Sequence, residues 1–294
     1  MPDAARGNIY DLGYQRYDGV RLGRGYAIYS IYTHSLRSAF GLGRSPSAKV
    51  FPIGLTMLAF LPAVIQLGIG ALVDNIVELF EASEYYGYTQ VILALFCAAV
   101  APELVGRDQR TRTLSLYFSR SLHRVDYAAA KYAALSTALL MLTLAPQLVL
   151  FIGNGLAAND IRGYAADEWD LVLPIVVSAI LLSVFISGIA LLIGSLTARR
   201  AYSTVAILAV FMLTWIIGGI VAETVDRTIA VLVLLFAPFH VMRGFTLYIF
   251  GEEPGELSAL GMVDFAGWIY VLAAIGWAAL TAFLLYRRYE RIDA

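Results

Sequence analysis

The chain has 294 residues, of which 60% are hydrophobic and only 15% are charged, whereas a soluble domain normally carries about 25% charged residues. This deficit predicts a membrane protein. The formal net charge of -1 gives no overall attraction to nucleic acid, and the single cysteine, Cys97, excludes an intrachain disulfide.

Residues 1–49 are polar and bear arginines, with no early apolar core of the kind that a signal peptide has. Within them, residues 26–40 place apolar, tyrosine-rich side chains on one face at helical spacing, and Arg37 lies among small polar residues on the other. The pattern favours an amphipathic helix in the cytoplasmic interface of the bilayer. The alternative is a small soluble helix packed on cytoplasmic loops, and under both interpretations His34 is a polar-face residue.

Six windows free of Asp, Glu, Lys and Arg are long enough to cross the hydrocarbon core, which takes about 20 apolar residues in a helix. With flanking residues included, the sequence predicts six spans. They cover residues 51–73, 86–105, 128–152, 171–196, 202–222 and 265–286.

The cations predict how these spans are oriented, because Arg and Lys near span ends stay on the cytoplasmic side. With the N-terminus inside, 18 of them fall on the cytoplasmic side and three, Arg162, Arg227 and Arg243, fall outside. Both termini are therefore expected in the cytoplasm.

Residues 228–251 are apolar but interrupted by Pro238, His240 and Arg243. A full crossing here would place the C-terminal arginines outside, against the charge rule. We therefore expect a re-entrant or interfacial helix pair on the outer side, broken at Pro238. The alternative is an ordinary span with a kink.

Catalytic and metal-binding patterns are missing from the sequence. The six windows contain no Asp, Glu, Lys, Arg or His, which a proton relay or an ion-coupled site would need at mid-membrane depth. Neither lysine stands in a P-loop, because Val50 follows Lys49 and Tyr132 follows Lys131. We expect no metal site, no cofactor and no enzymatic activity in this chain, so that ATP and Mg²⁺ would bind another polypeptide.

The segment 106–126 combines cations with a short apolar core. The positive-inside bias would account for the cations alone. The spacing indicates more, because an apolar stretch from Thr113 to Phe118 is flanked by charge, and a second helix then runs into the third span. A short helix of this kind at the mouth of a transporter is what a separate motor domain needs as a docking surface.

This stretch resembles the loop between the second and third spans of ABC-2 type transporter permeases, the membrane subunits of one class of bacterial ABC exporters. The family pattern is roughly G-E-x-E-x-G-T-L-x-x-L-L-S-x-P-x-S-R-x-x-Y-x-x-G-K. Asp108 stands at the first Glu, and Tyr117 and Phe118 stand at the Leu pair. The exact matches are Thr113, Leu114, Ser119, Arg124, Tyr127 and Lys131. Six positions depart from the pattern. In chain order, its Gly, Glu, Gly, Pro, Ser and Gly are replaced by Arg107, Arg110, Arg112, Ser121, His123 and Ala130.

The resemblance implies a single all-α permease domain over residues 1–294. It has six transmembrane helices, an N-terminal interfacial helix, a cytoplasmic coupling helix between spans 2 and 3, and an outer helix pair before span 6, as in ABC-2 or type V exporters. It also implies a place in the bacterial inner membrane, a separate ABC ATPase subunit, and a second permease copy or a similar permease. Because these glycines and the proline are missing, the pattern does not determine the detailed geometry of the turn, but the expected topology is unaffected.

The same resemblance assigns roles to residues of the loop. The contacts with the ATPase are expected from polar residues and from an apolar wedge formed by Leu116 and Tyr117. The polar and flanking residues of this region are Arg107, Asp108, Arg110, Arg112, Thr113 and Arg120. Arg124 and Lys131 are expected to tie the loop to lipid headgroups or, through Glu103, to the end of the second span.

In this family spans one, two and five line the substrate path. Here these spans are almost wholly apolar, as at Phe60, Ile65, Phe96, Phe211 and Trp215. A path without fixed charge suits a lipid, an amphipathic peptide or a drug-like molecule, although lipid-facing residues would look the same. Two other functions stay open. One is a scaffold or regulatory subunit that transports nothing, and the other is an ion-coupled secondary transporter, which would need mid-span charges or an inverted repeat.

Overall fold

The computed structural model describes residues 19, 22–73, 81–111, 113–118, 122–158, 161–263 and 266–291. Within these ranges the chain is helical and contains no strand. The long helices are α2 (Pro46–Val73), α3 (Ala82–Ala101), α6 (Arg124–Ala157), α8 (Trp169–Leu196), α9 (Arg200–Thr224) and α12 (Gly267–Glu290). The shorter ones are α1 (Arg24–Ala39), η1 (Pro102–Gly106), α4 (Arg107–Arg110), α5 (Leu114–Phe118), α7 (Ile161–Asp167), α10 (Arg227–Phe236) and α11 (Pro238–Phe250).

Six helices of the described chain are long and apolar enough to cross a membrane, and each overlaps one of the six predicted spans. The six-span, all-α prediction is therefore confirmed, and the chain is a multi-pass membrane protein. The helices extend past the apolar windows. For example, α2 begins at Pro46, because the fixed φ of proline suits the first turn of a helix and its missing N–H is not needed there.

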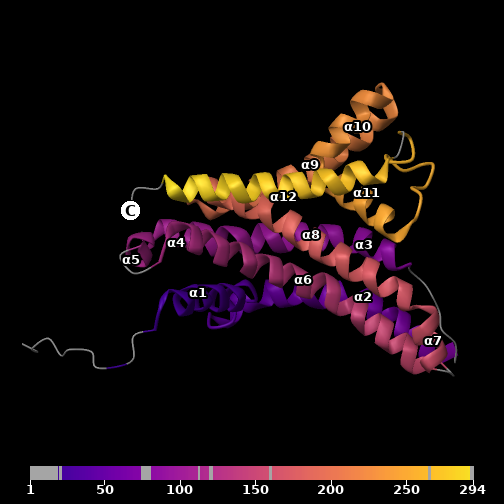
Figure 1. The fold of residues 1–294 in the computed structure, drawn as a ribbon, viewed down its shortest axis with the longest axis horizontal. Coiled ribbons are helices and arrows are strands. Elements are labelled where there is room, and N and C mark those ends of the chain that lie inside the picture. The colour runs from indigo at the N-terminus through magenta and orange to yellow at the C-terminus, as the bar shows by residue number, and fades with distance from the viewer. Residues whose placement is uncertain are drawn as a thin grey trace, which may run out of the picture.

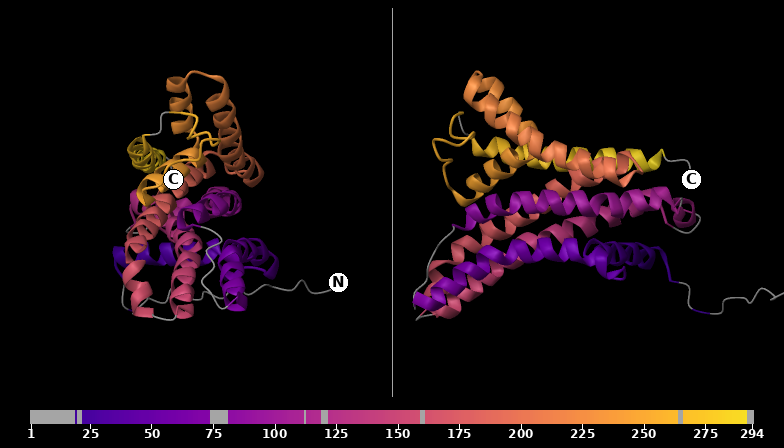
Figure 2. Two further views of the ribbon diagram at one scale, coloured as in Figure 1. Left: turned by 90° about the vertical axis from the view of Figure 1, so that its right-hand side faces the viewer. Right: turned by 180° about the vertical axis from the view of Figure 1, so that it is seen from behind.

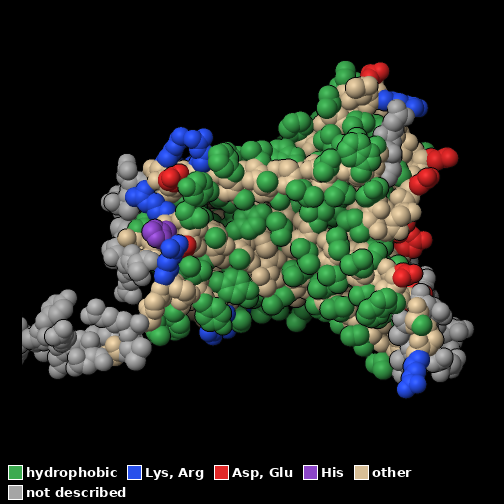
Figure 3. Space-filling model, in the orientation of Figure 1, with side chains coloured by type: hydrophobic (Ala, Val, Ile, Leu, Met, Phe, Trp, Pro, Cys, Tyr) green, Lys and Arg blue, Asp and Glu red, His purple; other side chains and the backbone are tan. Residues whose placement is uncertain are grey.

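The long helices lie side by side in one bundle (Figures 1 and 2). Helices α1, α4 and α5 gather at one end together with the end of α12, and α7, α10 and α11 lie toward the other (Figure 1). Hydrophobic side chains cover the middle of the visible face, Lys and Arg gather at the α1 end, and most of the Asp and Glu lie at the other end (Figure 3). This distribution is the one expected of a bundle whose middle faces lipid and whose ends face water.

Close helix contacts in the bundle depend on small residues. A Cβ added at Gly188 of α8 would lie 2.2 Å from Thr281 Oγ1 of α12 and 2.9 Å from the Tyr132 hydroxyl of α6. The Tyr132 hydroxyl donates to the carbonyl of Val184 (2.7 Å). Helices in a membrane gain little from hydrophobic burial against each other, so close packing and interhelical hydrogen bonds of this kind hold them together.

Helix α1 packs along α6, at the end of the bundle that also carries the loop between α3 and α6. Its first residue, Arg24, donates to both carboxylate oxygens of Asp126 (2.7 Å each), and the Tyr32 hydroxyl donates to Thr137 Oγ1 (3.1 Å). The helix covers most of the predicted range 26–40. Its polar contacts fix it against the bundle.

Helices α10 and α11 meet at a bend of 101°. Ala237, the residue between them, is extended, as residues before proline usually are, and Pro238 begins α11. With 10 and 13 residues, the two helices are only about 15 and 20 Å long at 1.5 Å per residue, too short to cross the hydrocarbon core singly. The chain breaks where the sequence predicts it.

Candidate functional site

The segment that links the second and third spans begins as a continuation of α3. The turn η1 has the wider π-helical hydrogen bonding, and it starts at Pro102, which has no N–H to donate. The helix runs on without a break to Arg110, so the span and the start of the loop form one rod of 29 residues. Helix α5 follows, and His123 caps α6 in a capping box with Asp126.

A buried ion pair fixes this loop to α6. The Nζ atom of Lys131 lies 2.9 Å from Asp108 Oδ2, and the Tyr127 hydroxyl donates to the same oxygen (2.7 Å). The side chains of Lys131 and Asp108 are 7% and 15% exposed. Because a buried charge is costly without its partner, this pair determines where α4 lies relative to α6.

Aromatic packing extends the contact to α12. Tyr117 and Phe118 of α5 pack on the Tyr127 ring, at centroid distances of 5.7 and 6.1 Å, and Tyr127 packs on Tyr289 of α12 at 5.3 Å. Burial raises the pKa of Tyr117, with a further contribution from the nearby negative charge of Asp108. The short helix α5 is therefore held against the bundle.

The carbonyl of Ser195, in the last turn of α8, joins three elements. It accepts from Gln109 Nε2 of α4 (3.2 Å) and from Arg288 of α12, at 2.9 Å from Nε and 2.5 Å from Nη2. The last carbonyls of a helix have no partner within it, and here side chains from α4 and α12 supply hydrogen bonds near that end. A displacement of α4 would therefore also disturb its contacts with α6, α8 and α12.

Glu103 lies in the π turn, and three arginines surround its carboxylate. Arg44 from the α1–α2 connection bonds to it, Arg200 Nη1 from the start of α9 lies 3.6 Å from it, and Arg110 Nη2 lies 4.0 Å from it. The expected partners of Glu103, Arg124 and Lys131, lie elsewhere. Lys131 pairs with Asp108, and Arg124 donates to the carbonyl of Glu290 (2.6 Å).

The residues expected to contact an ATPase fall into three groups. Arg107 and Arg110 are exposed on α4. Asp108 and Tyr117 turn toward the bundle, and the Thr113 hydroxyl donates to the carbonyl of Asp108 within the loop (3.3 Å). Leu116 lies in α5, with its side chain outside the described part of the structure, as Arg112 and Arg120 are entirely.

The apolar residues expected along a substrate path do not share one environment. Phe96 and Phe211 are fully buried in the bundle, and Phe211 packs on Phe239 of α11 at a centroid distance of 5.4 Å. Phe60 is half-buried, whereas Ile65 and Trp215 are 44% and 40% exposed on α2 and α9. The first two stabilise the bundle, and the last two are available to lipid or to another chain.

Sequence reasoning missed the arginines around Glu103, because they come from three separate segments. The available signal was one acid directly after Pro102 at the end of an apolar run. Among the described residues, no group of three or more His, Cys, Asp and Glu side chains could hold a metal ion.

Comparison with known families shows to which family this chain belongs. Residues 18–294 match the model of the ABC-2 family transporter protein, nearly the whole chain. Among curated proteins, none matches the chain. The family's permeases are transmembrane subunits without an ATPase site of their own, and they work in general with an ABC ATPase. The protein is a member of the ABC-2 family of transporter proteins and a multi-pass permease.

Proposed function

We propose that this permease is the membrane subunit of an ATP-driven exporter in the bacterial inner membrane, moving a hydrophobic or amphipathic substrate. Both termini lie in the cytoplasm, together with the loop between α3 and α6. A separate ABC ATPase docks on this loop, and a second permease, identical or similar, completes the transporter.

The observation that carries this proposal is the way the loop is fixed. The buried pair of Asp108 and Lys131 and the aromatic contacts of Tyr117 and Tyr127 hold α4 and α5 against α6 and α12. A flexible loop would absorb the movement of a docked motor, whereas a fixed one transmits it to the spans as a rigid-body displacement. Burying an ion pair carries a desolvation cost, and a loop that must stay rigid gives a reason for this cost.

The outer surface of the same loop supplies the contacts. Arg107 and Arg110 are exposed on α4, where they can pair with acidic side chains of an ATPase. From the family resemblance alone, Leu116 is the apolar residue proposed to join this contact. Asp108 serves this docking as a positioning residue, since its carboxylate is engaged by Lys131 and Tyr127.

Co-expression with the ATPase tests this proposal. ATP hydrolysis in reconstituted vesicles should require the permease. Arg107→Glu with Leu116→Glu should weaken docking about thirtyfold, because an interface hot spot contributes about 2 kcal/mol. Leu116→Glu with Tyr117→Ala should weaken docking at least as much, because loss of the Tyr117 ring also removes a contact that holds α5 against Tyr127. Arg291→Glu is the matched control, since Arg291 is exposed and directly follows α12, whose end lies at the same end of the bundle as the loop (Figure 1).

Hydrolysis that is independent of the permease, or equal loss in the Arg291→Glu control and in the loop variants, would contradict this docking. A transport assay that ran on a proton or sodium gradient without any ATPase would instead support a secondary transporter.

A further inference from the structure

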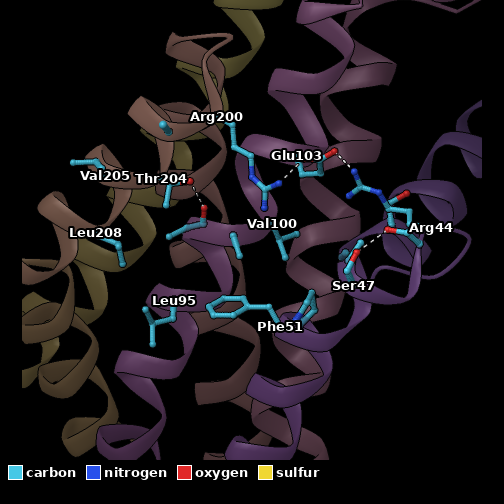
Figure 4. Close-up of a pocket in the computed structure, with 18 residues that line it drawn as sticks. Arg44, Ser47, Phe51, Leu95, Val100, Glu103, Arg200, Thr204, Val205 and Leu208 are labelled. Carbon is cyan, nitrogen blue, oxygen red and sulfur yellow. Dashed lines mark hydrogen bonds and ion pairs between the residues drawn. The ribbon is translucent and has the colours of Figure 1, made fainter.

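A cavity of about 980 Å³ opens among the first turns of α2, the end of α3 and the first turns of α9. Figure 4 shows Arg44, Glu103 and Arg200 at one end of it, and Phe51, Leu95 and Leu208 further along. One end is therefore charged and the other apolar. Neither water alone nor a purely apolar molecule would satisfy both ends.

The charged end has more cationic donors than its carboxylate can satisfy. Glu103 has two oxygens, and each guanidinium of Arg44 and Arg200, the two arginines of the lining, carries five N–H donors. Arg200 Nη1 lies 3.6 Å from Glu103 Oε2, beyond hydrogen-bond distance, and its side chain is 55% exposed. An anion that entered the cavity would find Arg200 ready to donate to it.

Two long helices add to this excess of positive charge. Helix α2 begins at Pro46 and α9 at Arg200, so the positive ends of both helix dipoles meet at the cavity. The residue before α9, Arg199, makes no side-chain cap, so the N–H groups of the first turn lack the usual capping partner. The hydroxyls of Ser45 and Ser47 also line the cavity.

The apolar end has the character of a site for a hydrocarbon chain. Its wall consists of aliphatic and aromatic side chains from three helices, among them Phe51 of α2, Leu95 of α3, and Val205 and Leu208 of α9. Phe51 is exposed in the cavity, with no partner ring among the described residues. A free inorganic anion would make no contact with these apolar side chains.

We propose that the cavity binds a membrane amphiphile with an acidic oxyanion head, such as a phosphate, and an apolar tail. Arg44 and Arg200 hold the head, and the apolar wall holds the tail. Glu103, which the π turn η1 directs toward the arginines, is the internal counter-ion that the head displaces. This inference rests on the proposed function and names the substrate class that the exporter would take up.

Fluorescence quenching in nanodiscs tests the inference on the permease alone, without any ATPase. Phe51→Trp places an indole in the cavity, and the signal is its quenching relative to the parent chain. One set of nanodiscs contains brominated phosphatidylglycerol, and the other contains brominated phosphatidylcholine as the zwitterionic control. We expect stronger quenching by phosphatidylglycerol. Inorganic phosphate in the buffer should leave that quenching unchanged.

Variants made in the Phe51→Trp chain identify the residues involved. Arg200→Gln should lower the apparent affinity for phosphatidylglycerol about fivefold, because one cation at a membrane surface contributes about 1 kcal/mol toward an anionic lipid. Arg199→Gln removes the same charge one residue away, outside the cavity lining, and should have little effect. Glu103→Gln should raise the affinity, because it removes the competing carboxylate and keeps the shape of the side chain.

Three outcomes would overturn the inference. Equal quenching by the two lipids would exclude recognition of an acidic head. Equal losses in Arg199→Gln and Arg200→Gln would show attraction by the surface in general, and displacement by inorganic phosphate would show a site for free anions. None of these results bears on permease-dependent ATP hydrolysis, so the exporter proposal would stand or fall separately.

Discussion

Loss of Lys131 should release the loop between α3 and α6. In Lys131→Met the Asp108 carboxylate keeps only the Tyr127 hydroxyl, in a position where Asp108 is 15% exposed. Removing one partner of a buried ion pair costs about 3–5 kcal/mol, and the residual exposure of Asp108 places this pair near the lower value, about 3 kcal/mol. This loss of free energy weakens the contact between α4 and α6, so the loop should open locally more often.

Hydrogen–deuterium exchange in nanodiscs measures this opening. The Thr111 amide bonds to the carbonyl of Arg107 (3.0 Å) and the Thr113 amide to that of Asp108 (3.1 Å). A loss of about 3 kcal/mol should make these amides exchange about a hundredfold faster. Lys49→Met is the matched control, because Lys49 makes no ion pair with a described residue.

A double variant separates the ion pair from simple loss of packing. Asp108→Asn with Lys131→Met removes both charges, and the loop should then exchange within about tenfold of the parent, because no unpaired charge stays buried. Unchanged exchange in Lys131→Met, or a double variant whose amides exchange as fast as those of Lys131→Met, would refute the argument that the pair fixes the loop.

Two further changes test the contacts around this loop. Tyr127→Phe removes one donor to the Asp108 carboxylate and keeps the ring, so the same amides should exchange about tenfold faster; no change would show that the hydroxyl is dispensable. Gly188→Ala forces a Cβ against Thr281 and should cost about 2 kcal/mol, seen as a lower midpoint of thermal unfolding in nanodiscs. Gly276→Ala, with nothing within 4 Å, should leave the midpoint unchanged or raise it, and equal losses at both glycines would contradict the packing argument.

The spans could be predicted from the sequence because each depends on local composition. A run of apolar residues long enough to cross a bilayer has few alternatives to a helix, since every backbone N–H and C=O must be bonded within the segment. The break before Pro238 was equally local, because proline restricts the residue that precedes it.

The contacts of the loop could not be predicted because they are not local. Asp108 stands in place of the first Glu of the family pattern, and nothing in the sequence indicated that its carboxylate would face Lys131, 23 positions further on. The arginines around Glu103 come from the α1–α2 connection, α4 and α9, which only the packed bundle brings together. The pairing of these charges depends on how each helix is rotated about its axis and on the extra residue in η1. Neither can be deduced from the number of charged residues in the sequence.

Chemical cross-linking tests the central claim, that an ATPase binds the loop between α3 and α6. The one cysteine of the chain, Cys97, is buried in α3, so Thr111→Cys on the exposed loop gives a single accessible thiol for a maleimide–benzophenone reagent. After illumination of the co-expressed complex, we expect the ATPase subunit to be attached at this position and not in Leu257→Cys. Leu257 is exposed in the connection between α11 and α12, which lies at the other end of the bundle (Figure 1). Attachment of the ATPase from Leu257→Cys and not from Thr111→Cys would contradict the account.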